Sequence, residues 1–207
     1  MKYPTLQVER RLWRKRYKRV ACLDEAGRGP LAGPVVAGAV CVNFQRCDLL
    51  GRSHLIRDSK QLSAKQREEF YKILTKHPAI EWGIGKVSEK VIDRINILEA
   101  TKLAMVRAFE KLKRKPDFLI LDGNFKINSE IPQKSIVKGD EKVFSCAAAS
   151  IIAKVTRDKM MRQYDKKYPD YGFAQNKGYS TDFHRQMLKK YGPSKIHRKS
   201  FSPVREA

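Results

Sequence analysis

The sequence predicts an α/β domain in which helices cover a five-stranded mixed β-sheet. Three strand-like apolar runs come early in the chain, and later strand-like runs alternate with segments of helical periodicity. In addition, acidic residues follow three of the predicted strands. Carboxylates at strand ends can converge in space although they are far apart in the sequence, so these observations also predict where a functional site would lie.

The first two strands flank a turn rich in glycine and proline. Residues 19–23 are typical of a short strand that ends at Asp24, and residues 34–42 (P-V-V-A-G-A-V-C-V) form a β-branched apolar run consistent with a buried strand. A third strand is expected over residues 81–87.

Two helices are indicated by the residues at their first turns. Ser63 with Gln66 forms a capping box, which predicts a helix that continues to about Leu74. Asn96 with Glu99 is expected to open a longer helix. Apolar side chains recur along this second helix near helical spacing, at Leu98, Met105, Phe109 and Leu112.

The second half of the chain supplies two more strands and two more helices. Residues 118–121 are expected to form a short buried strand that ends at Asp122, and residues 135–137 a weaker one just before Gly139 and Asp140. An Ala-rich helix follows from about residue 143 to residue 164 or beyond. Thr181 is suited to cap a final helix, which Gly192 and Pro193 would end.

The chain is strongly basic, with 44 Lys and Arg against 22 Asp and Glu and a formal net charge of +22. This balance favours association with polyanions, and nucleic acid is the first candidate partner. The alternative is a basic protein whose charge only keeps it soluble.

The 207 residues suit one main domain, because no linker-like tract divides the chain. We expect a basic N-terminal extension over residues 1–18 and a catalytic domain over residues 19–207 that includes a C-terminal helical region. The extension is either an arm or helix that touches nucleic acid or a solvated terminus, and the sequence leaves both interpretations open.

The four cysteines show no spacing that suits zinc, so reduced thiols are the default interpretation. No stretch reaches about 18 apolar residues, and residues 1–20 carry charges throughout instead of an apolar run. We therefore expect a protein without a membrane-spanning segment or secretory signal, located in the cytoplasm.

Four acidic residues at or near strand ends indicate chemistry, namely Asp24, Glu25, Asp122 and Asp140. Phosphodiester hydrolysis is served by two divalent cations that neutralise the phosphate, activate a water and support the leaving oxygen. Magnesium and similar ions prefer a few carboxylate ligands. The alternative is that Asp24 and Asp122 only form or cap turns.

These residues lie in segments that resemble one family. Residues 24–36 (D-E-A-G-R-G-P-L-A-G-P-V-V) are similar to the first motif of bacterial ribonuclease HII almost without departure. Further similar segments are D-S-K at 58–60, L-D-G-N at 121–124, K-G-D at 138–140, A-A-A-S-I-I-A-K-V-T-R-D at 147–158 and G-Y-S-T-D-F-H at 178–184. Together they span roughly residues 20–203.

The resemblance implies a ribonuclease H-like fold with a C-terminal helical extension and a metal-dependent endoribonuclease activity. Such an enzyme would hydrolyse the RNA strand of RNA–DNA hybrids and cut 5′ of single ribonucleotides in duplex DNA. The implied cofactor is a pair of Mg²⁺ or Mn²⁺ ions, and the products would carry 5′-phosphate and 3′-hydroxyl ends. The expected partner is nucleic acid, and we expect a monomer. The resemblance implies that the catalytic metal ligands are Asp24, Glu25, Asp122 and Asp140.

Asp158, in T-R-D, competes with Asp140 for the place of the fourth ligand. We favour Asp140, because Asp158 falls inside a predicted helix, where an ion pair or a role behind the ligands is expected.

Other residues are expected to contact the substrate. By resemblance, Gly27, Arg28 and Gly29 form the turn that reads the ribose 2′-hydroxyl, and glycines let the backbone approach closely. Tyr179 is similar to the tyrosine that stacks on the sugar at an RNA-to-DNA junction, although Ser180 stands where the family usually has glycine. Lys60 is expected to contact a backbone phosphate.

His184 has two interpretations, because it could assist product release or make a structural hydrogen bond. Two further hypotheses for the whole protein also stay open. The chain could be a basic nucleic-acid-binding protein without catalysis, which leaves the four carboxylates unexplained, or a nuclease of the same fold with another substrate preference.

Overall fold

The computed structural model describes residues 3–43, 45–46 and 62–207, and its centre is a five-stranded sheet in the order β3-β2-β1-β4-β5. Strands β1, β2 and β3 pair antiparallel, whereas β4 runs parallel to β1 and β5 parallel to β4. The strand bounds are β1 Val20–Ala26, β2 Val35–Val42, β3 Ile80–Val87, β4 Phe118–Asp122 and β5 Gln133–Ile136. The predicted mixed sheet is therefore confirmed.

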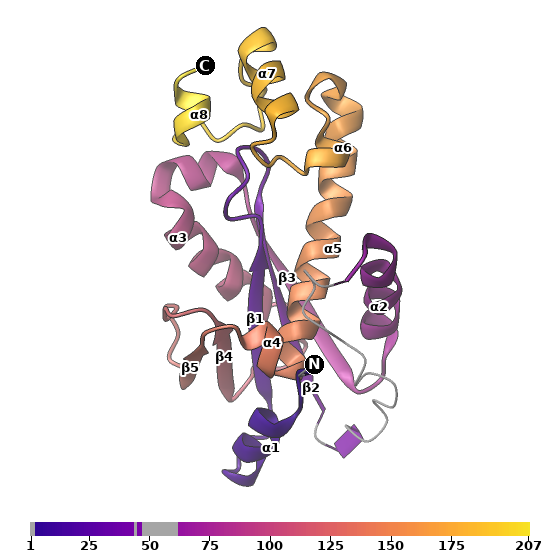
Figure 1. The fold of residues 1–207 in the computed structure, drawn as a ribbon. Coiled ribbons are helices and arrows are strands. Elements are labelled where there is room, and N and C mark those ends of the chain that lie inside the picture. The colour runs from indigo at the N-terminus through magenta and orange to yellow at the C-terminus, as the bar shows by residue number, and fades with distance from the viewer. Residues whose placement is uncertain (1–2, 44, 47–61) are drawn as a thin grey trace.

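Helices cover both faces of this sheet (Figure 1). Side chains alternate between the faces along each strand. Leu23 and Leu121 belong to the cluster that packs on α3 (Glu89–Phe109), whereas Val40 belongs to the cluster under α5 (Phe144–Lys167) and α2 (Ala64–Lys76).

Small residues let α5 and α3 approach the sheet closely. A side chain at Gly38 of β2 would overlap the Ala149 carbonyl of α5, and one at Gly85 of β3 would overlap the Ala104 carbonyl of α3. The Ala-rich sequence of α5 serves the same purpose, since its residues from Phe144 through Ala153 are all buried. Each face of the sheet therefore has a helix packed directly against it.

All three predicted capping residues make capping hydrogen bonds. Ser63 forms the full capping box with Gln66 at the start of α2, and the Thr181 side chain accepts a hydrogen bond from the His184 N–H at the start of α7 (Asp182–Tyr191). Asn96 caps a helix as predicted, because its Oδ1 accepts from the N–H groups of Leu98 and Glu99.

Three boundaries differ from the prediction. Helix α3 begins at Glu89 and kinks at Asn96, whose φ is 65°, so the predicted helix is only its second part. Strand β1 continues through Asp24 to Ala26, because its pairing with β2 extends to Ala26 and Val36. Asp140, expected just after a strand, lies in the short helix α4 (Gly139–Lys142).

Part of the basic N-terminal segment forms a helix, α1 (Gln7–Arg14), that packs near the start of β1. Glu9 is fully buried there, and its Oε1 accepts hydrogen bonds from the N–H and the hydroxyl of Ser145, at 3.0 and 2.7 Å. Arg10, Arg11 and Arg14 are exposed on the same helix.

The C-terminal region packs over the end of β1, at the top of Figure 1. Its elements are η3 (Pro169–Tyr171), α6 (Phe173–Asn176), α7 and α8 (Ser202–Arg205). Within the described residues, no helix is both long and apolar enough to cross a membrane.

Candidate active site

Asp24 and Asp122 lie on neighbouring parallel strands and on the same face of the sheet. Leu23 of β1 is in register with Leu121 of β4, so the next residue of each strand is an aspartate on the face covered by α5. Asp24 is buried, and Asp122 is partly buried at the end of its strand. The strand register therefore brings together two carboxylates that are 98 positions apart.

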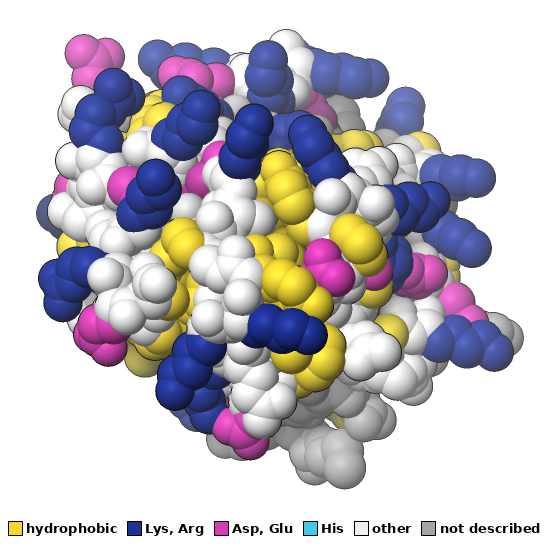
Figure 2. All heavy atoms as spheres, turned by 90° about the horizontal axis from the view of Figure 1, so that it is seen from above, with side chains coloured by type: hydrophobic (Ala, Val, Ile, Leu, Met, Phe, Trp, Pro, Cys, Tyr) yellow, Lys and Arg dark blue, Asp and Glu magenta, His cyan; other side chains and the backbone are white. Residues whose placement is uncertain are grey.

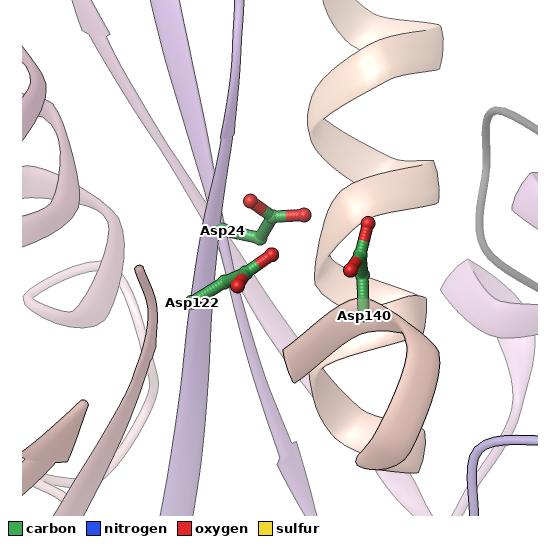
Figure 3. A group of neighbouring side chains, drawn as sticks. All are labelled: Asp24, Asp122 and Asp140. Carbon is green, nitrogen blue, oxygen red and sulfur yellow. The ribbon is translucent and has the colours of Figure 1, made fainter. Parts of the chain in front are cut away.

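Asp140 joins them from α4. The Gly139 N–H donates a 2.9 Å hydrogen bond to Asp122 Oδ1, which fixes the start of α4 against the end of β4. Asp24, Asp122 and Asp140 each offer a carboxylate oxygen, and these three oxygens lie within 4.8 Å of one another (Figure 3). This spacing suits carboxylates that share a divalent cation.

The electrostatics of the cluster favour a bound cation. Burial raises the pKa of Asp24 well above its usual value, and the neighbouring charges of Glu25, Asp122 and Asp140 raise it further. Like charges in a buried place disfavour ionisation unless a cation compensates them. The all-carboxylate donor set therefore fits a hard divalent ion.

Glu25 lies beside the cluster and not within it. Its side chain points toward Arg28, with 3.4 Å between Oε1 and Nη1, and burial raises its pKa. The second oxygen, Oε2, is buried and has no hydrogen-bond partner among the residues that the structure describes. An unpartnered buried carboxylate oxygen next to Asp24 is suited to a metal ion or a metal-bound water.

The rival ligand Asp158 lies in α5 and forms a 2.7 Å ion pair with Lys154. Among the described residues, it is not part of the group of converging carboxylates. Lys60, which we expected to contact a phosphate, lies outside the described residues, as does the whole D-S-K segment.

Two buried arginines fix the turn that follows β1. Arg198 donates to the carbonyl oxygens of Gly27, Arg28 and Gly33 at 2.6 to 3.0 Å. Arg157 donates to the carbonyl oxygens of Ala32 and Pro34. Burial lowers the pKa of Arg157 to about 10 and that of Arg198 to about 9. Both side chains remain charged at neutral pH and hold the turn rigidly.

Tyr179 lies against this turn, near the carboxylates. Its ring edge is 3.8 Å from where a side chain at Gly29 would begin, and 45% of its surface is exposed. A cleft of about 290 Å³ is lined by residues 24–29, Arg67, Asp122, Ser150, Lys154 and Tyr179. The predicted metal ligands Asp24, Glu25 and Asp122 thus share one cleft with the predicted sugar-contacting residues.

Comparisons with known proteins agree with this geometry. A sequence model of the ribonuclease HII family matches residues 21–204. The chain is 54% identical to ribonuclease HII of Chlamydia muridarum, over 92% of this chain and 85% of that protein. The chain belongs to the ribonuclease HII family.

Two further relatives support the same assignment. The chain is 50% identical to ribonuclease HII of Bacillus subtilis, over 95% of this chain and 74% of that protein. The crystal structure of ribonuclease H2 from Pyrococcus horikoshii superposes with a TM-score of 0.74 at 30% identity, over 91% of this chain and 96% of that one.

Membership of the ribonuclease HII family makes this chain a metal-dependent ribonuclease, a hydrolase with a ribonuclease H-like fold. The prediction of family and fold from the sequence motifs is confirmed. The hypothesis of a basic protein without catalysis is wrong, since the relatives are enzymes.

Sequence reasoning missed two groups of residues at this ribonuclease HII site. Arg157 and Arg198 received no role, although Arg157 lies within the T-R-D segment. Their partners are carbonyl groups of a distant turn, and backbone acceptors leave no trace in a sequence. For His184 the sequence left a structural hydrogen bond as one of two interpretations, but it gave no role to His197, whose Nε2 lies 3.0 Å from that of His184.

Proposed function

We propose that this chain hydrolyses the RNA strand of RNA–DNA hybrids and cuts 5′ of single ribonucleotides embedded in duplex DNA. The products carry 5′-phosphate and 3′-hydroxyl ends. In the cell, the reaction removes misincorporated ribonucleotides and RNA primers from DNA. The enzyme acts as a monomer in the cytoplasm.

One observation carries the proposal. The converging carboxylates of Asp24 and Asp122 line the same cleft as the turn at residues 27–29 and the ring of Tyr179. Metal-binding groups and groups suited to recognise a sugar are therefore next to each other, as cleavage at a ribonucleotide requires.

Asp24, Glu25, Asp122 and Asp140 would hold the catalytic metal, which we propose to be two Mg²⁺ or Mn²⁺ ions. When bound, two such ions supply an activated water, neutralise the scissile phosphate and stabilise the departing 3′ oxygen. The chain's own contribution is to hold the four carboxylates. Strands β1 and β4 fix Asp24 and Asp122, and the Gly139 N–H bond to Asp122 fixes the helix that carries Asp140.

The turn at residues 27–29 recognises the ribose. The Arg198 guanidinium fixes the carbonyl groups of Gly27 and Arg28, so the turn keeps one shape before substrate binds. Its backbone groups then hydrogen-bond the 2′-hydroxyl that distinguishes RNA from DNA. Tyr179 stacks on the sugar of the DNA side of the junction, which directs the cut to the 5′ side of the ribonucleotide.

Positive charge holds the duplex over this site. Lys and Arg side chains stand around the rim of the face formed by the C-terminal region, and hydrophobic side chains gather within it (Figure 2). Arg28, of which 44% is exposed, lines the cleft and contacts a phosphate together with Lys60.

The test compares four labelled duplexes under Mg²⁺, Mn²⁺ or chelator, with all products mapped to the nucleotide. They are a DNA duplex with one ribonucleotide, an RNA–DNA hybrid, an all-DNA duplex and an all-RNA duplex. We expect metal-dependent cutting of the first two alone, with the cut 5′ of the single ribonucleotide. Cutting of the all-DNA duplex, or cutting that chelator does not stop, would contradict the proposal.

A further inference from the structure

A chain of hydrogen bonds joins the C-terminal segment to Tyr179 through two buried histidines. The Ser194 N–H lies 2.9 Å from His197 Nδ1. His197 Nε2 lies 3.0 Å from His184 Nε2, and His184 Nδ1 lies 2.9 Å from the Tyr179 carbonyl oxygen. Neither histidine takes part in the proposed hydrolysis.

The two ends of this chain determine where every proton sits. The Ser194 N–H is a donor only, and the Ser194 hydroxyl, whose Oγ lies 2.8 Å from the same Nδ1, can donate as well, so His197 Nδ1 accepts and the ring proton of neutral His197 is on Nε2. That proton is donated to His184 Nε2, which leaves the proton of His184 on Nδ1. The Tyr179 carbonyl is an acceptor only, and it receives that proton. All the bonds are satisfied by one pair of neutral tautomers.

An additional proton on either histidine would disrupt this series of hydrogen bonds, since two N–H groups would then face each other at one of the bonds. The surroundings keep both rings neutral. Burial lowers the pKa of His197 to about 4, helped by the neighbouring His184, and burial also lowers the pKa of His184. The rings of Tyr171 and Phe173 pack against the pair, with the His197 ring centre 5.0 Å from that of Tyr171.

Among the described residues, the other hydrogen bonds of Tyr179 are all to backbone groups. The Tyr179 N–H donates to the Asn176 carbonyl, and the Tyr179 carbonyl also accepts from the Thr181 N–H. Gly178, with a φ of 83°, accepts from the Leu31 N–H of the turn after β1. His184 thus supplies the side-chain bond to the Tyr179 peptide.

The same C-terminal segment also fastens the sugar-reading turn. The Gly33 N–H donates to Ile196 and the Arg198 N–H donates to Leu31, both at 2.8 Å. The Arg198 side chain holds the carbonyls of residues 27 and 28. Residues 194–198 therefore anchor the turn directly and Tyr179 through the histidine pair.

We propose that His184 and His197 are positioning residues that set Tyr179 relative to the sugar-reading turn, so that they determine specificity for RNA-to-DNA junctions. The inference rests on the proposed function, because it assigns the junction contact to Tyr179. It predicts that loss of the pair reduces cleavage at single ribonucleotides more than cleavage of long hybrids, in which a junction is not required.

The kinetic test uses two variants of His197, one that keeps an aromatic ring and one that keeps a hydrogen-bond donor. His197→Phe keeps a ring without an N–H, whereas His197→Gln restores a donor near the position of Nε2. We expect His197→Phe to lower kcat/KM on the single-ribonucleotide duplex by roughly three- to tenfold relative to the hybrid, the usual effect of one lost hydrogen bond. His197→Gln should recover most of this loss.

His77→Phe is the matched control, because His77 follows α2 and does not line the cleft. It should leave the ratio between the two substrates unchanged. Equal ratios for His197→Phe and the wild type would overturn the inference, as would a His197→Gln variant that is no better than His197→Phe.

A second measurement does not depend on activity and keeps the inference separate from the proposed function. The protein has four histidines, so a long-range ¹H–¹⁵N spectrum of the imidazoles at pH 7.5 can be assigned with the single variants His184→Phe and His197→Phe. We expect a proton on Nδ1 of His184 and on Nε2 of His197. The opposite tautomer or a charged ring at either residue would overturn the inference, even if the enzyme cuts as proposed.

Discussion

At the residue scale, the turn after β1 depends on glycine at a position where two independent constraints meet. Gly27 has a φ of 97°, which side chains rarely adopt, and a Cβ there would overlap the Arg157 guanidinium. The sequence motif identified this glycine as close to the substrate. The structure adds that the close approach is also to a buried arginine of the protein itself.

Gly27→Ala is therefore expected to cost more stability than the backbone strain alone. The positive φ costs about 1 kcal/mol, and overpacking against Arg157 adds about 1–3 kcal/mol. Gly192→Ala is the matched control, since Gly192 has a φ of 70° but, among the described residues beyond its two chain neighbours, no atom within 4 Å of the added Cβ. Urea unfolding measures the loss in the free energy of unfolding for both variants. Equal losses would show that the Arg157 side chain moves aside at no cost, and would contradict the prediction.

At the element scale, helices were predictable where their capping residues are local in sequence. Ser63 and Thr181 mark true starts because each side chain bonds a backbone N–H three residues later. Asn96 makes the same kind of bond in the middle of α3. The predicted cap was therefore correct, but the helical residues 89–95 that precede it were not predicted. Local chemistry identifies a cap but not whether another helical turn precedes it.

How helix α1 packs on the domain could not be inferred from the sequence, since its anchor is a contact over 136 positions. The Glu9 carboxylate is buried against Ser145, an unusual place for a charge in a strongly basic segment. The exposed arginines of the same helix dominate its composition. This is why residues 1–18 resembled a solvated arm.

Glu9→Gln should stabilise the protein at alkaline pH. Burial raises the pKa of Glu9, so the wild type loses stability as pH rises above the usual value of 4.5 and the buried carboxyl ionises. The amide keeps the acceptor for Ser145 without the charge, and we expect a gain of about 1 kcal/mol or more in the free energy of unfolding at pH 8. The gain should shrink toward pH 4.5, and a gain independent of pH would contradict this origin.

At the scale of the whole molecule, the sequence predicted which residues form the site but not how they are arranged. Motifs identified Asp24, Asp122 and Asp140 because apolar runs precede the first two and a family-like segment contains the third. Their convergence depends on the parallel pairing of β1 with β4 and on α4. The arginine contacts that fix the turn after β1 join residues far apart in the chain, so patterns in the sequence did not reveal them. The pair of His184 and His197 spans only 13 positions, but the sequence there shows no motif that predicts a contact between the two rings.

The proposed activity depends most on the carboxylate cluster. The most direct test is the cleavage rate of Asp24→Asn in Mg²⁺ with a saturating concentration of a DNA duplex that holds one ribonucleotide. The variant removes one charge from the buried cluster and keeps the side-chain shape. Asp158→Asn, which alters an aspartate ion-paired with Lys154 outside the cluster, is the matched control.

We expect Asp24→Asn to lower the rate by about 10³-fold or more while duplex binding is retained, because metal ions contribute several kcal/mol to the transition state. Asp158→Asn should stay within about tenfold of the wild type. An Asp24→Asn variant that cleaves within tenfold of the wild-type rate would contradict the assignment of the active site.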